Sequence, residues 1–421
     1  MFKPRYLYTL LLWLLLPYIF IHLFWRARKQ PAYLGHIAER FGFYSIKSNR
    51  YIIWLHTVSV GETRAAASLV QSLQARYPDH QILLTHTTPT GREASEQLYG
   101  DKVLRVYLPY DYPFAVRRFL RHFKPQVGVL LETEIWFNLI HQCHTTKTPL
   151  LLLNTRLSEK SAAGYARFDK LTKFGLGQLH CVSAQTEEDA ARLTHLGAHD
   201  VSIMGNLKYD IAPPPDMLER GQQLRTLFGK NRPVFLAAST RVGEEALIIE
   251  MLAKMTVPRL LTIIVPRHPQ RFDEVANLLN QHGIKFQRRS DNQPIAANTQ
   301  VVLGDSMGEM FAYYAACDIA FIGGSLLPFG GQNLIEACAV GKPVLIGPHT
   351  YNFTQASILA VEQGAALRVP DVESLALALN RLFAKPEELK QMSEAGLAFV
   401  SANQGATTKA VASIEQAMAH S

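Results

Sequence analysis

The chain has 421 residues, which exceeds the size at which a single hydrophobic core usually divides, so we expect two domains. Its composition, with 48% hydrophobic and 19% charged residues, is that of a globular protein. The formal net charge of +8 suits an anionic membrane surface or anionic substrates, whereas the dispersed basic residues, without a basic-aromatic run or a helix-turn-helix pattern, argue against nucleic acid as a partner.

The first apolar segment, Tyr6–Trp25, is about 20 residues long and contains no Asp, Glu, Lys or Arg, which is enough to span a hydrocarbon core. Aromatic residues stand at both of its ends, where interfacial rings are favoured. No small-residue cleavage site follows it, and Arg26, Arg28 and Lys29 come next, so the segment is typical of an uncleaved anchor and not of a signal peptide. The alternative is a hydrophobic helix that enters only one leaflet or docks on the protein itself.

The charges around this segment bear on its orientation. Lys3 and Arg5 precede the apolar run and compete with the basic cluster that follows it. We expect residues 1–29 to form a single N-terminal membrane anchor, with the body of the protein on the cytoplasmic side.

A carboxylate is predicted at the first strand-to-helix turn of the body. The apolar run Tyr51–Thr57 is typical of a buried strand, Ser59-Val60-Gly61-Glu62 follows it, and Thr63–Arg76 is typical of a helix. In an open α/β sheet such a turn faces the crevice where ligands bind, so Glu62 is a candidate general base. The alternative is a capping box, in which Glu62 only satisfies a backbone N–H.

Apolar runs typical of strands alternate with helical stretches through the first half of the body, which predicts a parallel sheet covered by helices on both faces. The alternation stops at Asp210–Pro215, where three consecutive prolines cannot continue a strand or a helix interior. We place a domain linker there. The runs of the first half are Tyr51–Thr57, Gln81–Thr85, Val103–Leu108, Val127–Leu131, Leu150–Asn154, His180–Val182 and Val201–Met204.

A second series of apolar runs follows the linker, so the sequence predicts two similar α/β domains facing a cleft, at residues 30–209 and 216–402. The last helical stretch, within residues 403–421, is long enough to return to the first domain. The runs of the second half are Val234–Ala238, Leu260–Val265, Ile284–Gln287, Val301–Leu303, Ile319–Ile322, Pro343–Ile346 and Ala366–Val369.

Several common cofactor motifs are missing from the sequence. The first half has no G-x-G-x-x-G, and the chain has no Walker lysine loop, no HExxH and no Asp-x-Asp pair, which argues against nicotinamide, ATP hydrolysis and metal-chelated diphosphate sugars. The cysteines show neither paired nor metal-type spacing, so we expect reduced, buried thiols, no disulfide and no zinc. They are Cys143, Cys181, Cys317 and Cys338.

Three strand-to-helix turns of the second half have anion-binding character. Arg267 follows the run Leu260–Val265, where an arginine can clamp a phosphate or a carboxylate, although a surface turn explains it as well. Gly304–Glu309 follows the next run but one and has small residues that let backbone N–H groups approach an anion, although a plain helix start explains it equally. In Phe329–Ala337 a glycine pair leads into a helix that carries Glu336, whose carboxylate can accept hydrogen bonds from ribose hydroxyls. Together they predict a nucleotide-binding cleft.

The chain resembles, over nearly its whole length, the Kdo transferases of lipopolysaccharide assembly, which are membrane-anchored 3-deoxy-D-manno-octulosonic acid transferases. The resemblance implies a GT-B glycosyltransferase fold, with two Rossmann-like domains facing a cleft. The segments that carry it are Arg40-Phe41-Gly42-Phe43-Tyr44, Ser59-Val60-Gly61-Glu62-Thr63, Thr88-Pro89-Thr90-Gly91, Leu108-Pro109-Tyr110-Asp111, Glu132-Thr133-Glu134, Asn154-Thr155-Arg156-Leu157-Ser158, Gly205-Asn206-Leu207-Lys208, Val265-Pro266-Arg267-His268-Pro269 and Gly308-Glu309.

This resemblance implies transfer of Kdo from CMP-Kdo to a hydroxyl of the lipid A precursor at the inner membrane, with inversion and without a metal or another cofactor. Glu62 becomes the base that deprotonates the acceptor hydroxyl, and the leaving phosphate monoester agrees with the cationic and backbone N–H groups of the second half. The expected CMP site consists of Pro266, Arg267, Met307, Gly308, Glu309, Asn333, Leu334, Ile335 and Glu336.

Two positions depart from the family pattern: Phe137 stands where we expect proline, and Gln332 stands where we expect histidine. The alternatives are a GT-B glycosyltransferase that uses another nucleotide sugar, a sugar-nucleotide epimerase of the same fold, and a non-catalytic membrane-tethered protein that binds a sugar nucleotide. Turnover of CMP-Kdo on a lipid acceptor distinguishes them.

Overall fold

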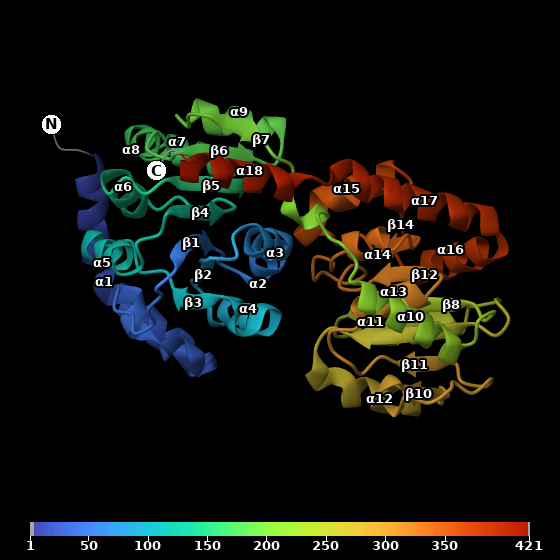
Figure 1. Ribbon diagram of the computed structural model, residues 1–421. Coiled ribbons are helices and arrows are strands. Elements are labelled where there is room, and N and C mark those ends of the chain that lie inside the picture. The colour runs from blue at the N-terminus through green and yellow to red at the C-terminus, as the bar shows by residue number, and fades with distance from the viewer. Residues whose placement is uncertain (1–3, 420–421) are drawn as a thin grey trace. The chain divides into compact units, whose positions relative to one another are not determined.

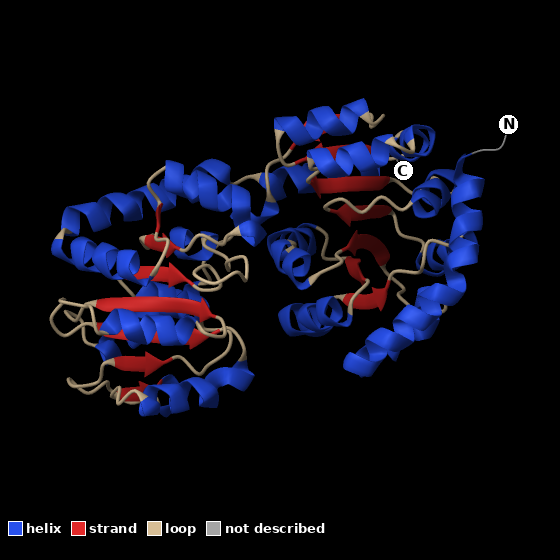
Figure 2. Ribbon diagram, turned by 180° about the vertical axis from the view of Figure 1, so that it is seen from behind, coloured by secondary structure: helices blue, strands red, loops and turns tan. Residues whose placement is uncertain are grey.

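Two sheets, each of seven parallel strands, organise the chain, which the computed structural model describes from residue 4 to residue 419 (Figure 1). Unit 1 comprises Met1–Asp210 and Gln404–Ser421, and unit 2 comprises Ile211–Asn403. Residues 1–3, which include the Lys3 that precedes the apolar run, and residues 420–421 lie outside the described residues. Helices cover both faces of each sheet (Figure 2).

The sheet of unit 1 has the strand order β3-β2-β1-β4-β5-β6-β7. Its strands are β1 (Tyr51–His56), β2 (His80–His86), β3 (Leu104–Tyr107), β4 (Val127–Leu131), β5 (Leu150–Thr155), β6 (Cys181–Ala184) and β7 (Val201–Ile203). Its helices are α1 (Pro4–Lys29), α2 (Val60–Ala65), α3 (Ala67–Arg76), α4 (Pro89–Tyr99), α5 (Pro113–Phe123), α6 (Phe137–Thr145), α7 (Glu159–Ala166), α8 (Asp169–Leu176), α9 (Glu187–His195) and α18 (Ala406–Ala419).

The sheet of unit 2 has the strand order β10-β11-β9-β8-β12-β13-β14. Its strands are β8 (Val234–Thr240), β9 (Leu261–Pro266), β10 (Phe286–Arg288), β11 (Val301–Leu303), β12 (Ile319–Ile322), β13 (Val344–Ile346) and β14 (Ala366–Arg368). Its helices are α10 (Pro215–Phe228), α11 (Glu244–Leu252), α12 (Phe272–Gln281), α13 (Met310–Ala316), α14 (Ile335–Ala339), α15 (Thr354–Glu362), α16 (Val372–Ala384) and α17 (Pro386–Asn403).

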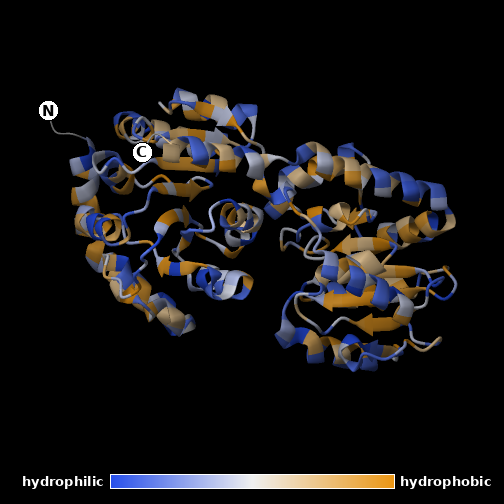
Figure 3. Ribbon diagram, viewed as in Figure 1, coloured by the Kyte–Doolittle hydropathy of each residue, from blue (hydrophilic) through white to orange (hydrophobic). Residues whose placement is uncertain are grey.

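Every apolar run predicted as a strand overlaps one of these strands, so the prediction of two parallel α/β sheets is confirmed. The strands are nearly continuous in apolar residues because helices cover both faces, and Figure 3 shows them coloured mainly as hydrophobic. The helix predicted over Thr63–Arg76 begins earlier, at Val60, and is divided at Ala66 into α2 and α3.

Alternate residues of β1 belong to two separate cores of unit 1. Trp54 packs edge-on against Phe119 of α5, with 4.9 Å between the ring centroids. Ile53 and Leu55 belong to the opposite core, to which α18 contributes Ile414. The period of two along a strand thus separates the two layers of helices.

The C-terminal helix α18 is part of unit 1. The Asp210 carboxylate accepts hydrogen bonds from the backbone N–H of Gly405, at 2.7 Å, and of Thr407. The side chain of Arg76 pairs with Glu415 at 2.7 Å. The segment that leaves unit 1 after Asp210 and the segment that re-enters it are therefore held together at one carboxylate.

In each sheet the chain order reverses beside the first strand, between β1 and β4 in unit 1 and between β8 and β12 in unit 2. Ligands of open α/β sheets bind outside the carboxyl ends of the strands at such a reversal. The turns that follow β1, β4, β8 and β12 are therefore the first places to look for functional side chains.

The packing of Trp54 against Gly128 of β4 predicts that adding one methyl group at Gly128 destabilises unit 1. A Cβ added at Gly128 would lie 2.5 Å from the Trp54 ring, so we expect Gly128→Ala to lower the free energy of unfolding of unit 1 by about 1–3 kcal/mol. All four tryptophans precede residue 137, so denaturant unfolding followed by tryptophan fluorescence reports on unit 1. Gly164→Ala in α7, where a Cβ meets no atom within 4 Å, is the matched control and should not destabilise the unit. Equal stability of the two variants would contradict the packing described.

Candidate functional site

The turn after β1 holds Glu62 through both of its carboxylate oxygens. The backbone N–H of Val58 donates to Oε2 at 2.6 Å, and the Ser59 hydroxyl donates to Oε1 at 2.8 Å. Ser59 is also the N-cap of α2, and its Oγ accepts the backbone N–H of Glu62 at 3.3 Å. The capping interaction predicted as an alternative is therefore present, and it fixes the orientation of the carboxylate.

Burial gives this carboxylate unusual proton affinity. Only 9% of Glu62 is exposed, and burial raises the pKa of its carboxyl above the ordinary value. The Val58 N–H opposes this shift, whereas the nearby Glu132 adds to it. A carboxylate with a raised pKa is a stronger base when it is ionised.

Two further carboxylates follow β4, the strand beside β1 at the order reversal. Glu132 lies 3.6 Å from the Lys208 ammonium, and Glu134 accepts a hydrogen bond from the Trp136 indole at 2.8 Å. Burial raises the pKa of Glu134 to about 7, with the negative charges of Glu62 and Glu132 adding to the shift. The sequence carried a signal for this cluster, a Glu-Thr-Glu segment at a strand end, but we predicted no role for it.

Buried hydrogen bonds between the ends of β1 and β2 stabilise the turn that carries Glu62. The Thr57 hydroxyl lies 3.1 Å from both the Thr63 hydroxyl and His86 Nδ1, and the Thr88 hydroxyl donates to the Val58 carbonyl at 2.9 Å. Burial lowers the pKa of His86 to about 4, so this imidazole is neutral at physiological pH. These groups position the turn.

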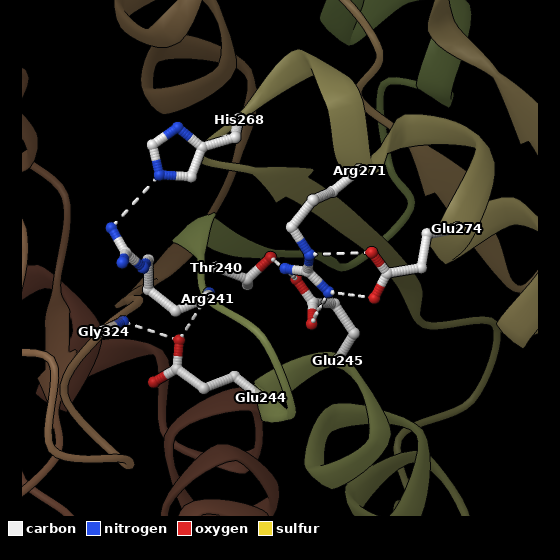
Figure 4. A network of polar contacts seen from close by, with 8 residues as sticks. All are labelled: Thr240, Arg241, Glu244, Glu245, His268, Arg271, Glu274 and Gly324. Carbon is white, nitrogen blue, oxygen red and sulfur yellow. Dashed lines mark hydrogen bonds and ion pairs between the residues drawn. The ribbon is translucent and has the colours of Figure 1, made fainter. Parts of the chain in front are cut away.

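In unit 2 a fully buried carboxylate, Glu244, ties the turn after β8 to the loop after β12 (Figure 4). Its Oε2 accepts the backbone N–H groups of Gly324, at 2.6 Å, and Arg241, at 2.9 Å, and its Oε1 accepts that of Leu326 at 3.1 Å. Burial raises the pKa of this carboxyl, and these N–H groups oppose the shift. Sequence reasoning did not identify this carboxylate.

A buried ion pair joins α11 to the segment after β9. The Arg271 guanidinium makes two parallel contacts with Glu245, at 2.7 and 2.9 Å, and the Thr240 hydroxyl donates to the same carboxylate at 2.6 Å (Figure 4). Arg241 contacts His268 Nε2 at 3.2 Å. The segment that carries Pro266 and Arg267 is thereby fixed against the turn after β8.

Arg267 and the glycine-rich turn before α14 lie together. The Arg267 Nε donates to the side-chain oxygen of Gln332 at 3.2 Å. In the same turn Asn333 donates to Glu336 at 3.1 Å and accepts the backbone N–H of Ile335 at 3.0 Å. The glutamine that departs from the family pattern thus orients the predicted phosphate-binding arginine.

Met307 and Glu309 line a pocket of about 800 Å³ within unit 2, together with residues of α10 and of the segment after β10. Arg220 and Arg289 both pair with Glu309, the latter at 3.2 Å. Gly308 has a φ of +79°, which favours glycine at this turn. Neither Arg267 nor Glu336 lines this pocket, so the predicted CMP residues fall into two groups. The sequence analysis did not predict Arg220 or Arg289 as site residues.

Among residues 4–419, no group of three or more His, Cys, Asp or Glu side chains is arranged to hold a metal ion. All four cysteines are free and buried.

Comparison with known proteins identifies the family. Residues 35–211 match the model of the 3-deoxy-D-manno-octulosonic acid transferases, and residues 281–399 match that of the group 1 glycosyl transferases. The chain is 41% identical to the 3-deoxy-D-manno-octulosonic acid transferase of Bordetella pertussis, over 98% of this chain and 99% of the relative, and 39% identical to that of Haemophilus influenzae, over 96% of each chain. The chain belongs to the 3-deoxy-D-manno-octulosonic acid transferase family.

Solved structures confirm the GT-B fold of this transferase. A glycosyltransferase from Rickettsia africae aligns with a TM-score of 0.58 over 89% of this chain and 100% of that structure, at 15% identity. A UDP-GlcNAc 2-epimerase from Neisseria meningitidis aligns with a TM-score of 0.52 over 87% of this chain and 100% of that structure, at 14% identity. At these identities the likeness concerns the fold alone.

The other departure from the family pattern also has a structural reason. Phe137 is the first residue of the transferase's helix α6. Proline is accepted at that position because the first N–H of a helix has no intrahelical partner. Here a phenylalanine occupies it and is buried against Gly175 and Tyr8.

The raised pKa of Glu134 predicts a pH-dependent stability of unit 1. Its folded-state pKa of about 7 exceeds the ordinary value of 4.5, so the stability that the protonated group contributes is complete below about pH 4.5 and is lost as the pH rises to about 7. We expect Glu134→Gln, which is neutral and can still accept the indole N–H, to raise the unfolding temperature at pH 8 and to change it little at pH 5. Glu96→Gln on the exposed face of α4 is the control. If the difference in unfolding temperature between Glu134→Gln and the wild type did not grow with pH, the pKa of Glu134 would not be raised in the folded protein.

Proposed function

We propose that this transferase moves Kdo from CMP-Kdo to a hydroxyl of the lipid A disaccharide precursor in lipopolysaccharide core biosynthesis, with inversion and without a metal. The observation that carries the proposal is a full-length match to relatives named as 3-deoxy-D-manno-octulosonic acid transferases, together with a buried, oriented carboxylate at the order reversal of unit 1. The partners are then CMP-Kdo, the lipid A precursor and an anionic membrane surface.

Glu62 is the proposed general base, and its capping contacts support that role. An ionised carboxylate can accept about four hydrogen bonds, and Glu62 accepts one from Val58 and one from Ser59. Acceptor capacity therefore remains for a sugar hydroxyl. The base takes the hydroxyl proton, the acceptor oxygen forms a bond to the anomeric carbon of Kdo, and the bond from that carbon to the phosphate oxygen breaks, which releases CMP.

The donor site is proposed in unit 2. Arg267 supplies positive charge for the phosphate, and its bond to Gln332 limits the orientations of the guanidinium. Glu336 is the proposed acceptor of hydrogen bonds from the ribose hydroxyls, and its hydrogen bond from Asn333 supports this role because it limits the orientations of the carboxylate. The remaining proposed CMP contacts are Pro266, Met307, Gly308, Glu309, Leu334 and Ile335.

Replacing the proposed base should separate transfer from binding. We expect Glu62→Gln to keep the fold and CMP affinity but to reduce Kdo transfer by roughly 100- to 10,000-fold. The amide oxygen can still accept the Val58 N–H, and the amide NH₂ can donate to the Ser59 hydroxyl, but the side chain cannot take the proton. Transfer is measured with CMP-Kdo and detergent-dispersed lipid A precursor, with Glu96→Gln as the matched control. Near wild-type turnover of Glu62→Gln would leave Glu62 with the capping role alone.

The donor site predicts a loss of nucleotide affinity when its arginine is removed. We expect Arg267→Ala to weaken CMP binding by roughly ten- to a hundredfold, since the phosphate loses a charge-assisted hydrogen bond. Calorimetry with CMP measures the change, and Arg381→Ala on α16, whose side chain is 46% exposed, is the control. Unchanged CMP affinity in Arg267→Ala would remove this residue from the site.

A further inference from the structure

The N-terminal helix α1 is packed on unit 1 along one face, and Figures 1 and 2 both show it running beside α5 and α6. It is long and apolar enough to cross a membrane, with a mean hydropathy of 2.0. Its less exposed residues recur every three or four positions from the first turn to the last, for example Arg5, Thr9, Leu12, Leu23 and Ala27. That spacing defines a single helix face, which we call the docked face.

The first turns of the docked face make buried polar contacts with unit 1. The Arg5 guanidinium, only 7% exposed, donates to the side-chain oxygen of Asn138 at 2.9 Å, and the Thr9 hydroxyl donates to the same oxygen at 3.0 Å. The Tyr8 hydroxyl donates to Asp111 at 2.8 Å. Burial raises the pKa of Asp111 to about 7, and the Arg5 charge opposes the shift. These contacts hold the start of the helix against the body.

The contacts continue along the helix. The Tyr112 hydroxyl donates to the Leu12 carbonyl at 2.6 Å, and the Trp13 ring lies 5.0 Å from the Tyr112 ring. Further along, Phe20 stacks on Phe41 with 5.6 Å between the centroids. The docked face therefore extends over the length of α1, and the helix has no free stretch long enough to leave the body and cross a bilayer.

The opposite face of α1, which we call the outer face, is exposed and apolar. Leu7, Leu14 and Ile21, at heptad spacing along it, are 71%, 70% and 67% exposed. No charged residue interrupts Tyr6–Trp25. An apolar surface of this length, on a protein whose two units already bury hydrophobic cores of their own, is typical of contact with lipid.

Basic side chains flank the outer face. The neighbouring helix α5 has exposed arginines at 117, 118 and 121 and no acidic residue. Arg118 lies 5.3 Å from the Phe114 ring, which in turn stacks on Trp13, so this charge is close to α1. Such cations suit anionic headgroups, but they would be costly at the depth of the acyl chains, where a transmembrane α1 would bring the docked α5.

We propose that α1 lies flat in the interface of one anionic leaflet, with its outer face in the lipid and its docked face on unit 1, and does not cross the bilayer. The N-terminus and the body are then on the same side of the membrane. The inference rests on the membrane location proposed above but not on the transfer reaction.

This arrangement connects the membrane to the carboxylates of unit 1. The short segment from Glu134 to Asn138 carries a site carboxylate at one end and the partner of Arg5 and Thr9 at the other. Between them Phe137 packs edge-on against Tyr8, with 5.2 Å between the centroids. A helix seated in the headgroup region thus holds the carboxylate segment close to the level at which the sugar of a lipid acceptor lies.

Spin labels on the outer face test the orientation. Leu7→Cys, Leu14→Cys and Ile21→Cys are labelled one at a time in the full chain, whose native cysteines are all buried. The proteins are placed in vesicles of phosphatidylethanolamine and phosphatidylglycerol, and label depth is measured from collisions with oxygen and with a water-soluble nickel complex. Seven residues of helix span about 10 Å, so a crossing helix puts the three labels at clearly different depths.

A flat helix gives three equal depths just below the headgroups. A deepest label at residue 14, or a steady gradient from 7 to 21, would overturn the inference in favour of a crossing helix. If all three labels were in water, both the flat orientation of α1 and the proposed membrane location would be overturned. Kdo transfer by the same variants on detergent-dispersed acceptor reports on the proposed function separately, because that assay needs no bilayer.

Discussion

A buried carboxylate that accepts backbone N–H groups holds the first strand-to-helix turn of both units. Each follows a Val-Gly pair, as Glu62 after β1 and as Glu244 after β8. A buried carboxylate is costly unless it is hydrogen-bonded, so each turn is stable only in the conformation that supplies its donors. The loops at the order reversal of each sheet depend on this constraint.

The two carboxylates differ in how completely they are satisfied. Glu244 is fully buried and accepts three backbone N–H groups from two loops, which is the environment of a structural group. Glu62 accepts one backbone N–H and one hydroxyl and keeps 9% of its surface exposed, beside two further carboxylates. The same local arrangement thus builds a rigid loop in unit 2, whereas in unit 1 it leaves a carboxylate with a raised pKa and unused hydrogen-bond acceptor capacity.

Helix α1 changes how the apolar N-terminus of this transferase is understood. Its length and composition favour a membrane anchor, but they are also compatible with a helix on the surface. The contacts of Arg5 and Tyr8 with groups of unit 1 make it part of the body, as do its contacts with α6 and α8. In the arrangement proposed above, the membrane-contacting face of α1 and the carboxylate segment belong to the same unit, which suits the proposed acceptor, whose sugar would lie at the lipid surface.

The sequence by itself determined the sheets and the position of Glu62, because apolar periodicity and a strand-to-helix turn are local signals. Colinear motifs determined the family. Only the tertiary structure decided that Glu132 and Glu134 lie beside Glu62, that Arg220 and Arg289 pair with Glu309, and that Gln332 orients Arg267. These groups are distant in sequence or lack a diagnostic spacing. Apart from Arg220, which lies on α10, they come together because parallel strands bring their carboxyl ends to one edge of a sheet.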